Sequence, residues 1–494
     1  MRDWDRARGR QAWVLCVVGV AQLMVVLDAT IVNIALPSAQ HDLGFDDGGR
    51  QWVVTAYALA FGSLLLLAGR LSDLFGRRAV FLAGLAGFAA ASLLGGSAPN
   101  FKVLVCARAL QGVSGALLAP AALSILTTTF TGARERSRAF AIYGAIAGAG
   151  GAGGLLLGGV LTEYLTWRWC LFVNVFLAAF AAAGALVFLS GRPRGLWTAQ
   201  RPRLDLPGTL AVSAALFFVV YGFSNADTAG WRSSSTWSPL AAGGVLLVAF
   251  VWWQTRSEHP LLPLRVLADR NRAASFLSFL ITSGGMFGVF LFLTYYLQLS
   301  LNYSPVKTGL AFLPLVLVLM VTAQVAMIVL LPRTGPKPLV PTGMALSAAA
   351  MLWFGRLDAT STYAAHLLPP LLVMGLGLGL IFAPAMTMAT QGVDPDDAGV
   401  ASAMVNTTQQ IGGSVSTALL NTLATSATAA YLVGRPNTAQ VVVDAQMHGF
   451  AVAYWWAGGF FAAGAVVSVL LYPRRAASAE TAGERDPESE PAFA

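Results

Sequence analysis

The chain has 494 residues, of which 56% are hydrophobic and 11% are charged. Soluble domains carry about 25% charged residues, so a water-soluble fold of this composition would expose an excessive apolar surface. The composition also excludes a disordered chain, a collagen-like chain and a disulfide scaffold. The formal net charge is +8, but Lys and Arg stand in short stretches between apolar runs. That pattern is typical of a polytopic membrane protein and not of a nucleic-acid-binding surface.

Apolar segments follow one another along almost the whole chain. Runs of this length and hydrophobicity predict membrane-spanning helices. The first run is too long for the apolar part of a signal peptide and has no convincing cleavage site, so it should remain as an anchor. We predict an all-α membrane protein with fourteen spans, at residues 12–36, 51–68, 79–97, 103–126, 139–161, 169–189, 206–223, 237–254, 273–298, 308–331, 339–355, 364–388, 399–424 and 449–472.

The distribution of positive charge predicts the orientation. If the N-terminus is cytoplasmic, the cytoplasmic segments hold 23 of the 31 Lys and Arg residues, the outer loops hold seven, and Arg108 lies inside the fourth segment. Positive residues are enriched in cytoplasmic loops, so both termini are predicted to be cytoplasmic. Residues 476–494 contain five acidic residues and little apolar content. This composition predicts a disordered cytoplasmic tail.

A short internal repeat relates the two ends of the chain. Gly115 and Pro120 in the fourth segment recur as Gly379 and Pro384 in the twelfth, both at an offset of 264 residues. The offset pairs segments 1–6 with segments 9–14 and leaves two segments as an insert. Two parallel six-helix repeats around a central site form one class of secondary transporter. We predict an N-terminal half at 1–190, a two-helix insert with flanking cytoplasmic segments at 191–272, and a C-terminal half at 273–475.

Two charged residues lie well inside predicted spans. Asp28 is midway along the first segment and Arg108 is in the fourth. A charge at that depth costs several kcal/mol unless it is paired, hydrated or protonated. Asp28 is therefore a candidate proton carrier, and Arg108 is its obvious partner in proton coupling. The alternative is a purely structural role for each, with Asp28 hydrogen-bonded to a neighbouring helix and Arg108 in a static ion pair.

Four amide side chains in the predicted spans are candidates for a substrate cavity: Asn33, Gln111, Asn406 and Gln410. Asn406 and Gln410 are four residues apart and share one helical face. The same amides could instead hydrogen-bond one helix to another. The sequence leaves both roles open.

The cytoplasmic loop between the second and third segments reads Gly69-Arg-Leu-Ser-Asp-Leu-Phe-Gly-Arg-Arg78. Gly69 and Gly76 permit a tight turn. Asp73 can accept hydrogen bonds from a helix start or pair with an arginine. Arg77 and Arg78 are expected to hold the loop at the cytoplasmic face.

The fifth segment is rich in glycine. Gly144 and Gly148 are four residues apart, as are Gly154 and Gly158, and Gly159 follows directly. Small residues at this spacing form a flat face that another helix can approach closely. The stretch could bend as two halves move, or it could serve static packing.

Together these motifs resemble the major facilitator superfamily, and in particular its fourteen-helix drug:proton antiporter family. The loop from Gly69 to Arg78 is similar to the family's hallmark loop, and the stretch from Trp167 to Asn174 is another family-like element. The family's fifth-helix motif usually reads Gly-Pro-x-x-Gly-Gly, whereas here the slot from Gly154 to Gly159 has no proline. The resemblance implies proton-driven export of lipophilic drugs or antibiotics across the bacterial plasma membrane, with Asp28 in the coupling step.

Other classes of function find no support in the sequence. None of the three lysines follows a glycine, so the phosphate-binding loop of an ATP-driven transporter is missing. Cysteine and histidine lack metal-ligand spacing, and no converging nucleophile and base suggests an enzyme. We expect no cofactor or metal; the expected partners are a small lipophilic substrate, protons and the bilayer, with no nucleic acid. The oligomeric state is unknown, and the alternatives are a transporter of a polar metabolite or a non-transporting sensor on the same fold.

Overall fold

The computed structural model describes residues 2–130, 133–189, 205–231, 233–257, 260–262, 264–358, 361–390, 393, 398–436 and 438–472. Within these ranges every regular element is helical. Fourteen helices have 19 residues or more: α1 (Arg2–Leu43), α2 (Asp47–Phe75), α3 (Arg77–Gly96), α4 (Phe101–Thr129), α5 (Ala133–Tyr164), α6 (Trp169–Phe188), α7 (Leu206–Ala229), α8 (Ser234–Gln254), α10 (Arg270–Tyr295), α11 (Pro305–Val325), α13 (Pro336–Phe354), α14 (Leu368–Thr390), α15 (Ala398–Leu432) and α16 (Ala439–Leu471). The short helices are α9 (Leu264–Ala268) and α12 (Leu331–Thr334), and π-helical turns η1 (Tyr296–Ser300), η2 (Ala326–Leu330) and η3 (Tyr363–Leu367) adjoin α10, α11 and α14.

Each long helix contains or overlaps one predicted segment, but many extend beyond it. The predicted span 12–36 lies inside the much longer α1, and the predicted span 449–472 begins well after the start of α16. Hydropathy marks the part of a helix that lies in hydrocarbon, whereas backbone hydrogen bonds continue into polar ends. Among the described residues, nine helices are long and apolar enough to cross a membrane, so a count of fourteen spans stays a prediction. The predicted tail at 476–494 lies outside the described residues.

Local sequence signals fix many of the helix starts. Asn100 caps α4 by accepting a hydrogen bond from Val103 N at 3.0 Å. Asp269 caps α10 in the same way, from Arg272 N at 3.0 Å. Such caps satisfy backbone donors that have no partner within the helix.

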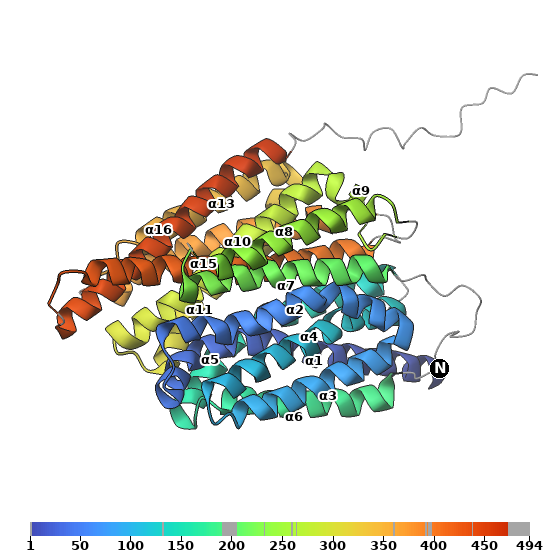
Figure 1. The fold of residues 1–494 in the computed structure, drawn as a ribbon. Helices are drawn as coiled ribbons and strands as arrows, with labels where there is room; N and C mark the ends of the chain where they lie inside the picture. The colour runs from blue at the N-terminus through green and yellow to red at the C-terminus, as the bar shows by residue number, and fades with distance from the viewer. Residues whose placement is uncertain are drawn as a thin grey trace, which may run out of the picture.

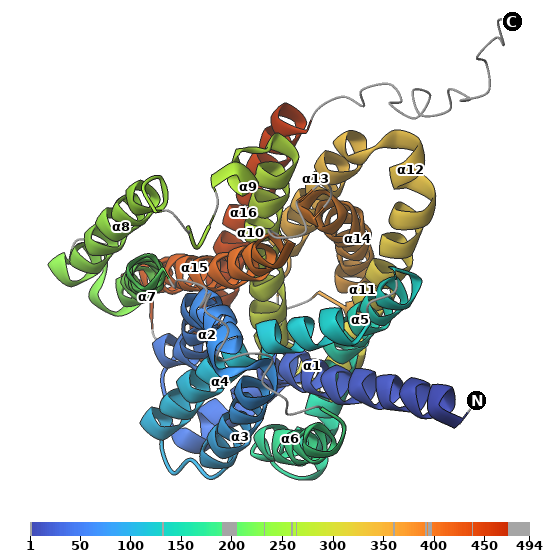
Figure 2. The same ribbon diagram turned by 90° about the vertical axis from the view of Figure 1, so that its right-hand side faces the viewer.

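The helices form two bundles with the same internal packing (Figures 1 and 2). In the N-terminal half, α1 to α6, the contacting pairs include α2 with α4, α3 with α4, α1 with α5, α3 with α6 and α1 with α6. In the C-terminal half the corresponding pairs are α11 with α14, α13 with α14, α10 with α15, α13 with α16 and α10 with α16. The packing thus follows the register of the internal repeat.

Two helix pairs form the main contact between the halves, and the insert lies beside one of them. α2 packs against α15, and α5 packs against α11. α7 contacts both α2 and α15, while α8 packs on α7 at the edge of the molecule (Figure 2). The insert therefore borders the interface between the halves along one side.

The halves are held together at the end that the charge pattern places outside the cell. Tyr295 Oη donates to Gln40 Oε1 at 2.8 Å, and Val306 N donates to Glu163 Oε2 at 3.0 Å. The guanidinium of Arg50 lies over the Tyr295 ring, 3.9 Å from its centroid. Each contact joins one half to the other. The structure is therefore closed at its predicted outer end.

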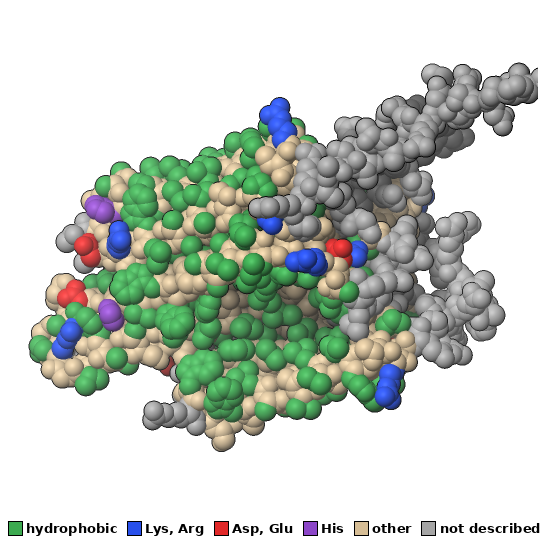
Figure 3. All heavy atoms as spheres, turned by 90° about the horizontal axis from the view of Figure 1, so that it is seen from above, with side chains coloured by type: hydrophobic (Ala, Val, Ile, Leu, Met, Phe, Trp, Pro, Cys, Tyr) green, Lys and Arg blue, Asp and Glu red, His purple; other side chains and the backbone are tan. Residues whose placement is uncertain are grey.

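The side of the molecule in Figure 3 is covered mainly by hydrophobic side chains, and charged side chains gather toward the ends of the helices. This is the surface expected of a protein embedded in lipid. The exposed apolar side chains lie on peripheral helices and include Phe176, Phe180 and Val187 on α6, Val245 and Val248 on α8, Leu317 and Val321 on α11, and Val466 and Leu470 on α16.

A buried acid ties the insert together at its predicted cytoplasmic end. Asp205, which is 6% exposed, caps α7 by accepting from Gly208 N at 2.9 Å. It also accepts from Trp253 Nε1 and Gln254 Nε2 of α8, both at 2.6 Å, and from Leu261 N at 3.4 Å. Burial by itself raises the pKa of the Asp205 carboxyl, but these hydrogen bonds outweigh it and lower the pKa below its ordinary value.

Candidate functional site

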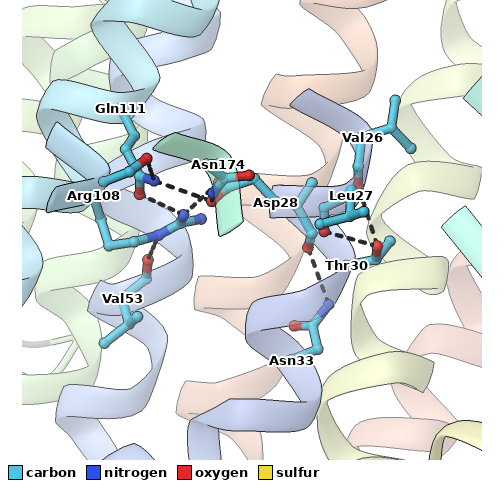
Figure 4. A network of polar contacts seen from close by, with 11 residues as sticks. Val26, Leu27, Asp28, Thr30, Asn33, Val53, Arg108, Gln111 and Asn174 are labelled. Atoms are coloured by element: carbon cyan, nitrogen blue, oxygen red, sulfur yellow. Dashed lines mark hydrogen bonds and ion pairs between the residues drawn. The ribbon is translucent and has the colours of Figure 1, made fainter. Parts of the chain in front are cut away.

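The two charged residues predicted inside spans meet within the N-terminal half. Arg108 Nη1 on α4 donates to Asp28 Oδ2 on α1 at 2.5 Å (Figure 4). Asp28 is 0% exposed and Arg108 is 2% exposed. A charge-assisted contact of this kind is stronger than a bond between neutral groups. The bundle thus encloses a complete ion pair.

The second oxygen of Asp28 accepts from two amides. Asn174 Nδ2 on α6 donates to Asp28 Oδ1 at 2.7 Å, and Gln111 Nε2 on α4 donates to the same oxygen at 3.1 Å. Both carboxylate oxygens therefore have donors. An ionised carboxylate is an acceptor only, so this arrangement fits the charged form of Asp28.

Arg108 has further partners besides the carboxylate. Its Nη1 donates to Gln111 Oε1 at 2.8 Å, its Nε donates to Val53 O on α2 at 3.1 Å, and its guanidinium lies 4.6 Å from the centroid of the Tyr57 ring. Gln111 Nε2 in turn donates to Ser92 Oγ on α3 at 2.8 Å. The network links α1, α2, α3, α4 and α6, and Arg108 would keep a place in it without Asp28.

The C-terminal half has no equivalent charge pair at the repeat positions. Phe292 stands 264 residues after Asp28, and Leu372 stands 264 residues after Arg108. Phe292 is buried against Phe450 and Tyr454, with ring centroids 5.6 Å and 6.1 Å away. The halves share one packing scheme but differ in chemistry, because this position is ionic in one half and aromatic in the other.

The glycines of α5 allow it to approach α1 beside Asp28. A Cβ atom at Gly154 would lie 2.0 Å from Thr30 Oγ1, and one at Gly158 would lie 3.0 Å from Ile31 O. Neither distance can be accommodated without a shift in α1 or α5. Gly144 and Gly148 lie in α5, but their surroundings are outside the described part of the chain.

A neighbouring face of α5 also approaches the C-terminal half closely. A Cβ atom at Gly159 would lie 2.7 Å from Pro305 O of α11. Gly309 of α11 faces back in the same way, because a Cβ atom there would lie 2.5 Å from Leu155 O. α5 therefore lies directly between the helix that carries Asp28 and the other half of the molecule.

The turn between α2 and α3 corrects one expectation from the sequence. Gly69 is not part of a turn: it lies inside α2, which stays helical as far as Phe75. Gly76 alone makes the turn, with φ of 86°, a value that glycine adopts without steric cost. The surroundings of the Asp73 side chain lie outside the described part of the chain.

The two arginines after this turn begin α3. Arg78 Nη2 donates to Leu186 O at 2.9 Å, near the last turn of α6, where carbonyl groups lack partners within the helix. Arg77 is half-buried at the first position of α3. In the structure, Arg78 links α3 to the end of α6 on the predicted cytoplasmic side.

The four amide candidates for a substrate cavity are in different environments. Gln111 belongs to the Asp28 network and is fully buried, so in this conformation it does not line a cavity. Asn33 is 3% exposed and donates to Ala29 O at 3.3 Å. Asn406 and Gln410 are half-buried on α15, and Gln410 packs against α2 close to Gly62.

The stretch from Trp167 to Asn174 contributes more than the sequence indicated. Trp167 Nε1 and Arg168 Nη2 each donate to Asp42 Oδ2 at 2.9 Å, at the predicted outer end of α1. Asn174 donates to Asp28, also on α1. Its role in the site was not predicted, although it is the one amide in an otherwise apolar span, which is a usable signal.

A small apolar cavity separates Arg108 from Trp167 and is lined also by Val32, Ala35, Leu36, Ala39, Val53, Leu104, Cys170 and Leu171.

Comparison with known proteins agrees with this architecture. The model of the Major Facilitator Superfamily matches residues 18–417. The chain is 49% identical to a puromycin resistance protein of Streptomyces alboniger, over 96% of this chain and 94% of that protein. It is 40% identical to a cephamycin export protein of Amycolatopsis lactamdurans, over 83% of this chain and 84% of that protein.

A solved structure shows the same fold. It is a bacterial homologue of the human lysosomal transporter Spinster in an inward-facing and unoccupied conformation, with a TM-score of 0.65 at 16% identity, covering 94% of this chain and 97% of that one. In the parts of this chain that the structure describes, no group of three or more His, Cys, Asp or Glu side chains is arranged to hold a metal ion. The chain belongs to the major facilitator superfamily, as a multi-pass transporter of the bacterial plasma membrane and not an enzyme.

Proposed function

We propose that this transporter exports antibiotics in exchange for protons and that Asp28 binds the proton. The observation that carries the proposal is the carboxylate–guanidinium pair enclosed in the N-terminal half, with Asp28 0% exposed. An unpaired charge at this depth is costly. The carboxyl group therefore has two stable forms: ionised and paired with Arg108, or protonated and independent of it.

The names of the relatives support antibiotics as the substrate class. Besides the puromycin resistance and cephamycin export proteins, the chain resembles a tetracenomycin C resistance and export protein and a lincomycin resistance protein, each at 34% identity. We propose lipophilic, neutral or singly charged compounds, because Asp28 is the one acid deep inside a predicted span. Asn33, Asn406 and Gln410 are the candidate residues to contact the substrate between the halves.

Protonation of Asp28 would act on the interface between the halves through α5. It removes the charge that binds α1 to α4, while Arg108 keeps its bonds to Gln111 and Val53. α1 touches the face of α5 with Gly154 and Gly158, and the neighbouring face with Gly159 touches α11 of the opposite half. A change in how α1 is held is thereby transmitted to the contact that has to open and close.

The energy available is sufficient for concentrative export. Moving one charge through 100 mV is worth about 2.3 kcal/mol, which corresponds to a substrate gradient of roughly 50-fold. One carboxyl group per cycle therefore suffices at that potential.

We further propose that the halves 1–190 and 273–475 rock against each other, with the insert 191–272 beside their interface and both termini in the cytoplasm. The repeated helix pairs support two equivalent units. The apolar periphery supports a surrounding bilayer. The closed outer end corresponds to one of the two states that alternating access requires.

The test is transport by the wild type and by Asp28→Asn in a bacterial host that lacks its own pumps. The wild type should raise resistance to lipophilic antibiotics and lower the accumulation of a fluorescent lipophilic dye, and a protonophore should abolish both effects. Asp28→Asn should reach the membrane in equal amount and accumulate dye as the empty vector does. Asp42→Asn is the matched control, because it alters an acid of the same helix outside the network. Export against a gradient by Asp28→Asn would refute the assignment.

A further inference from the structure

Only one of the two polar atoms of the Asn174 amide makes a hydrogen bond in the network. Its Nδ2 donates to Asp28 Oδ1 at 2.7 Å, and its side chain is 0% exposed. Its Oδ1 is buried and, within the described residues, has no hydrogen-bond donor. Buried acceptors are nearly always satisfied in native proteins, so an exception needs a physical explanation.

The geometry offers one explanation. A half-turn about χ2 of Asn174 exchanges its two terminal atoms, so that Oδ1 takes the place of Nδ2 facing Asp28 Oδ1. This torsion is broad and roughly two-fold in asparagine, and the exchange requires no movement of the backbone. An ionised carboxylate only accepts hydrogen bonds, whereas a carboxylic acid also has one O–H to donate. The two orientations of the amide match the two protonation states of the acid.

We propose that Asn174 is the partner of Asp28 in both protonation states. In the ionised state Nδ2 of Asn174 donates to Asp28 Oδ1, as observed. When a proton binds at Asp28 Oδ1, the amide turns over and its Oδ1 accepts the new O–H. Asn174 is thus a positioning residue for the proton carrier. The inference rests on the proposed binding of a proton by Asp28.

The exchange would keep α1 attached to α6 when its ionic contact with α4 is lost. Protonation removes the charge that Arg108 on α4 attracts, but the bond to Asn174 on α6 persists with donor and acceptor reversed. The carboxyl group therefore stays in position and hydrogen-bonded while the ionic contact between α1 and Arg108 of α4 is lost. No buried acid is left without a partner at the moment when the halves move.

The neighbouring groups cannot hydrogen-bond to both protonation states of Asp28 in this way. Gln111 Oε1 already accepts from Arg108, and Gln111 Nε2 already donates to Ser92 and Asp28. Turning that amide would bring its NH₂ group against the guanidinium. Among the described residues, the other titratable or charged groups that interact with Asp28 are Arg108 on α4, Tyr57 on α2 and Cys170 on α6. An ordinary phenol or thiol is neutral below about pH 8.

Infrared difference spectroscopy of the full-length protein in lipid nanodiscs tests the exchange. Acidification should produce a carboxylic acid C=O band that is missing in Asp28→Asn. It should also shift one side-chain amide C=O band to lower wavenumber, since that carbonyl gains a donor. Asn174→Leu should abolish the amide shift. Asn33→Leu, which removes another buried amide, should leave the shift unchanged.

The possible outcomes separate this inference from the proposed function. A carboxyl band without an amide shift, or a shift that survives in Asn174→Leu, would overturn the role of Asn174 alone. The absence of any Asp28-dependent carboxyl band would overturn proton binding by Asp28 and the inference with it.

Transport provides a second readout. Asn174→Leu should slow proton-driven efflux at least several-fold and displace its pH profile, because neither form of Asp28 then has this partner. Asn174→Ser should largely restore the rate and the profile, since a hydroxyl group both donates and accepts. The serine variant also removes the amide band, so it allows the spectroscopic test even if the leucine variant fails to insert. A wild-type pH profile in Asn174→Leu would overturn the proposal.

Discussion

Removing one charge of the buried pair should destabilise the protein more than removing both. Arg108→Gln leaves the Asp28 carboxylate with two amide donors, at 2.7 Å and 3.1 Å, but without its cation. Asp28→Asn leaves Arg108 with Gln111 Oε1, Val53 O and the Tyr57 ring. Breaking a buried ion pair on one side costs about 3–5 kcal/mol. We expect Arg108→Gln at the upper end of this range and Asp28→Asn at the lower end, because Arg108 keeps more partners.

The double variant Asp28→Asn/Arg108→Gln contains no buried charge and should lose less stability than either single variant, so that its loss falls far below the sum of the single losses. Unfolding midpoints of the four purified proteins would show this order. The double variant should fold but should not couple export to protons.

Two results would refute this reasoning. One is strict additivity of the single losses in the double variant, which would mean that the two charges do not interact. The other is a wild-type midpoint for Arg108→Gln at pH 8. The control is the pair of Arg168 with Asp42, whose side chains are 29% and 49% exposed; breaking it should cost no more than about 1 kcal/mol.

Three further changes test other parts of the structure. Gly158→Ala should lower the free energy of unfolding by about 1–3 kcal/mol by overpacking and should slow efflux, because its Cβ would lie 3.0 Å from an α1 carbonyl oxygen. A Cβ at Gly151 has nothing within 4 Å, so Gly151→Ala should match the wild type in stability and in efflux. Asp205→Asn should lower the unfolding midpoint at pH 7 by the equivalent of about 1–3 kcal/mol. Folding lowers the pKa of the Asp205 carboxyl. The extra stability of the wild type should therefore be complete above about pH 4 and should vanish as the pH falls through the pKa of the folded protein. Tyr295→Phe removes one hydrogen bond between the halves, so spin-label distances across the outer end should show about five-fold more of the outward-open state. The hydroxyl of Tyr296 bonds to Asp358 O within one half, so Tyr296→Phe should leave these distances unchanged.

The sequence predicted the positions of the helices better than their ends. Apolar runs located all fourteen long helices, because burial in lipid requires about the same side-chain character along a whole span. The ends depend on caps and on packing beyond the bilayer. Gly69 shows the difference: it looked like part of a turn, but the helical backbone of α2 continues past it to Gly76.

The site was predictable only in its charged members. Asp28 and Arg108 stand out because a charge inside an apolar run is costly and therefore conspicuous. Asn174 and Ser92 are neutral, and polar residues of this kind occur in many spans as packing contacts. Gln111 was assigned to a substrate cavity, whereas the packing of α4 against α3 and α1 places it inside the network.

By itself, the order of the amino acids determined the membrane class, the repeat and the two residues that carry charge into the bundle, because hydropathy and charge act locally along the chain. Only the tertiary structure decided which donors surround Asp28 and that α5 lies between α1 and α11. These features arise where helices distant in sequence converge, and convergence depends on side-chain packing between helices, which no single segment encodes.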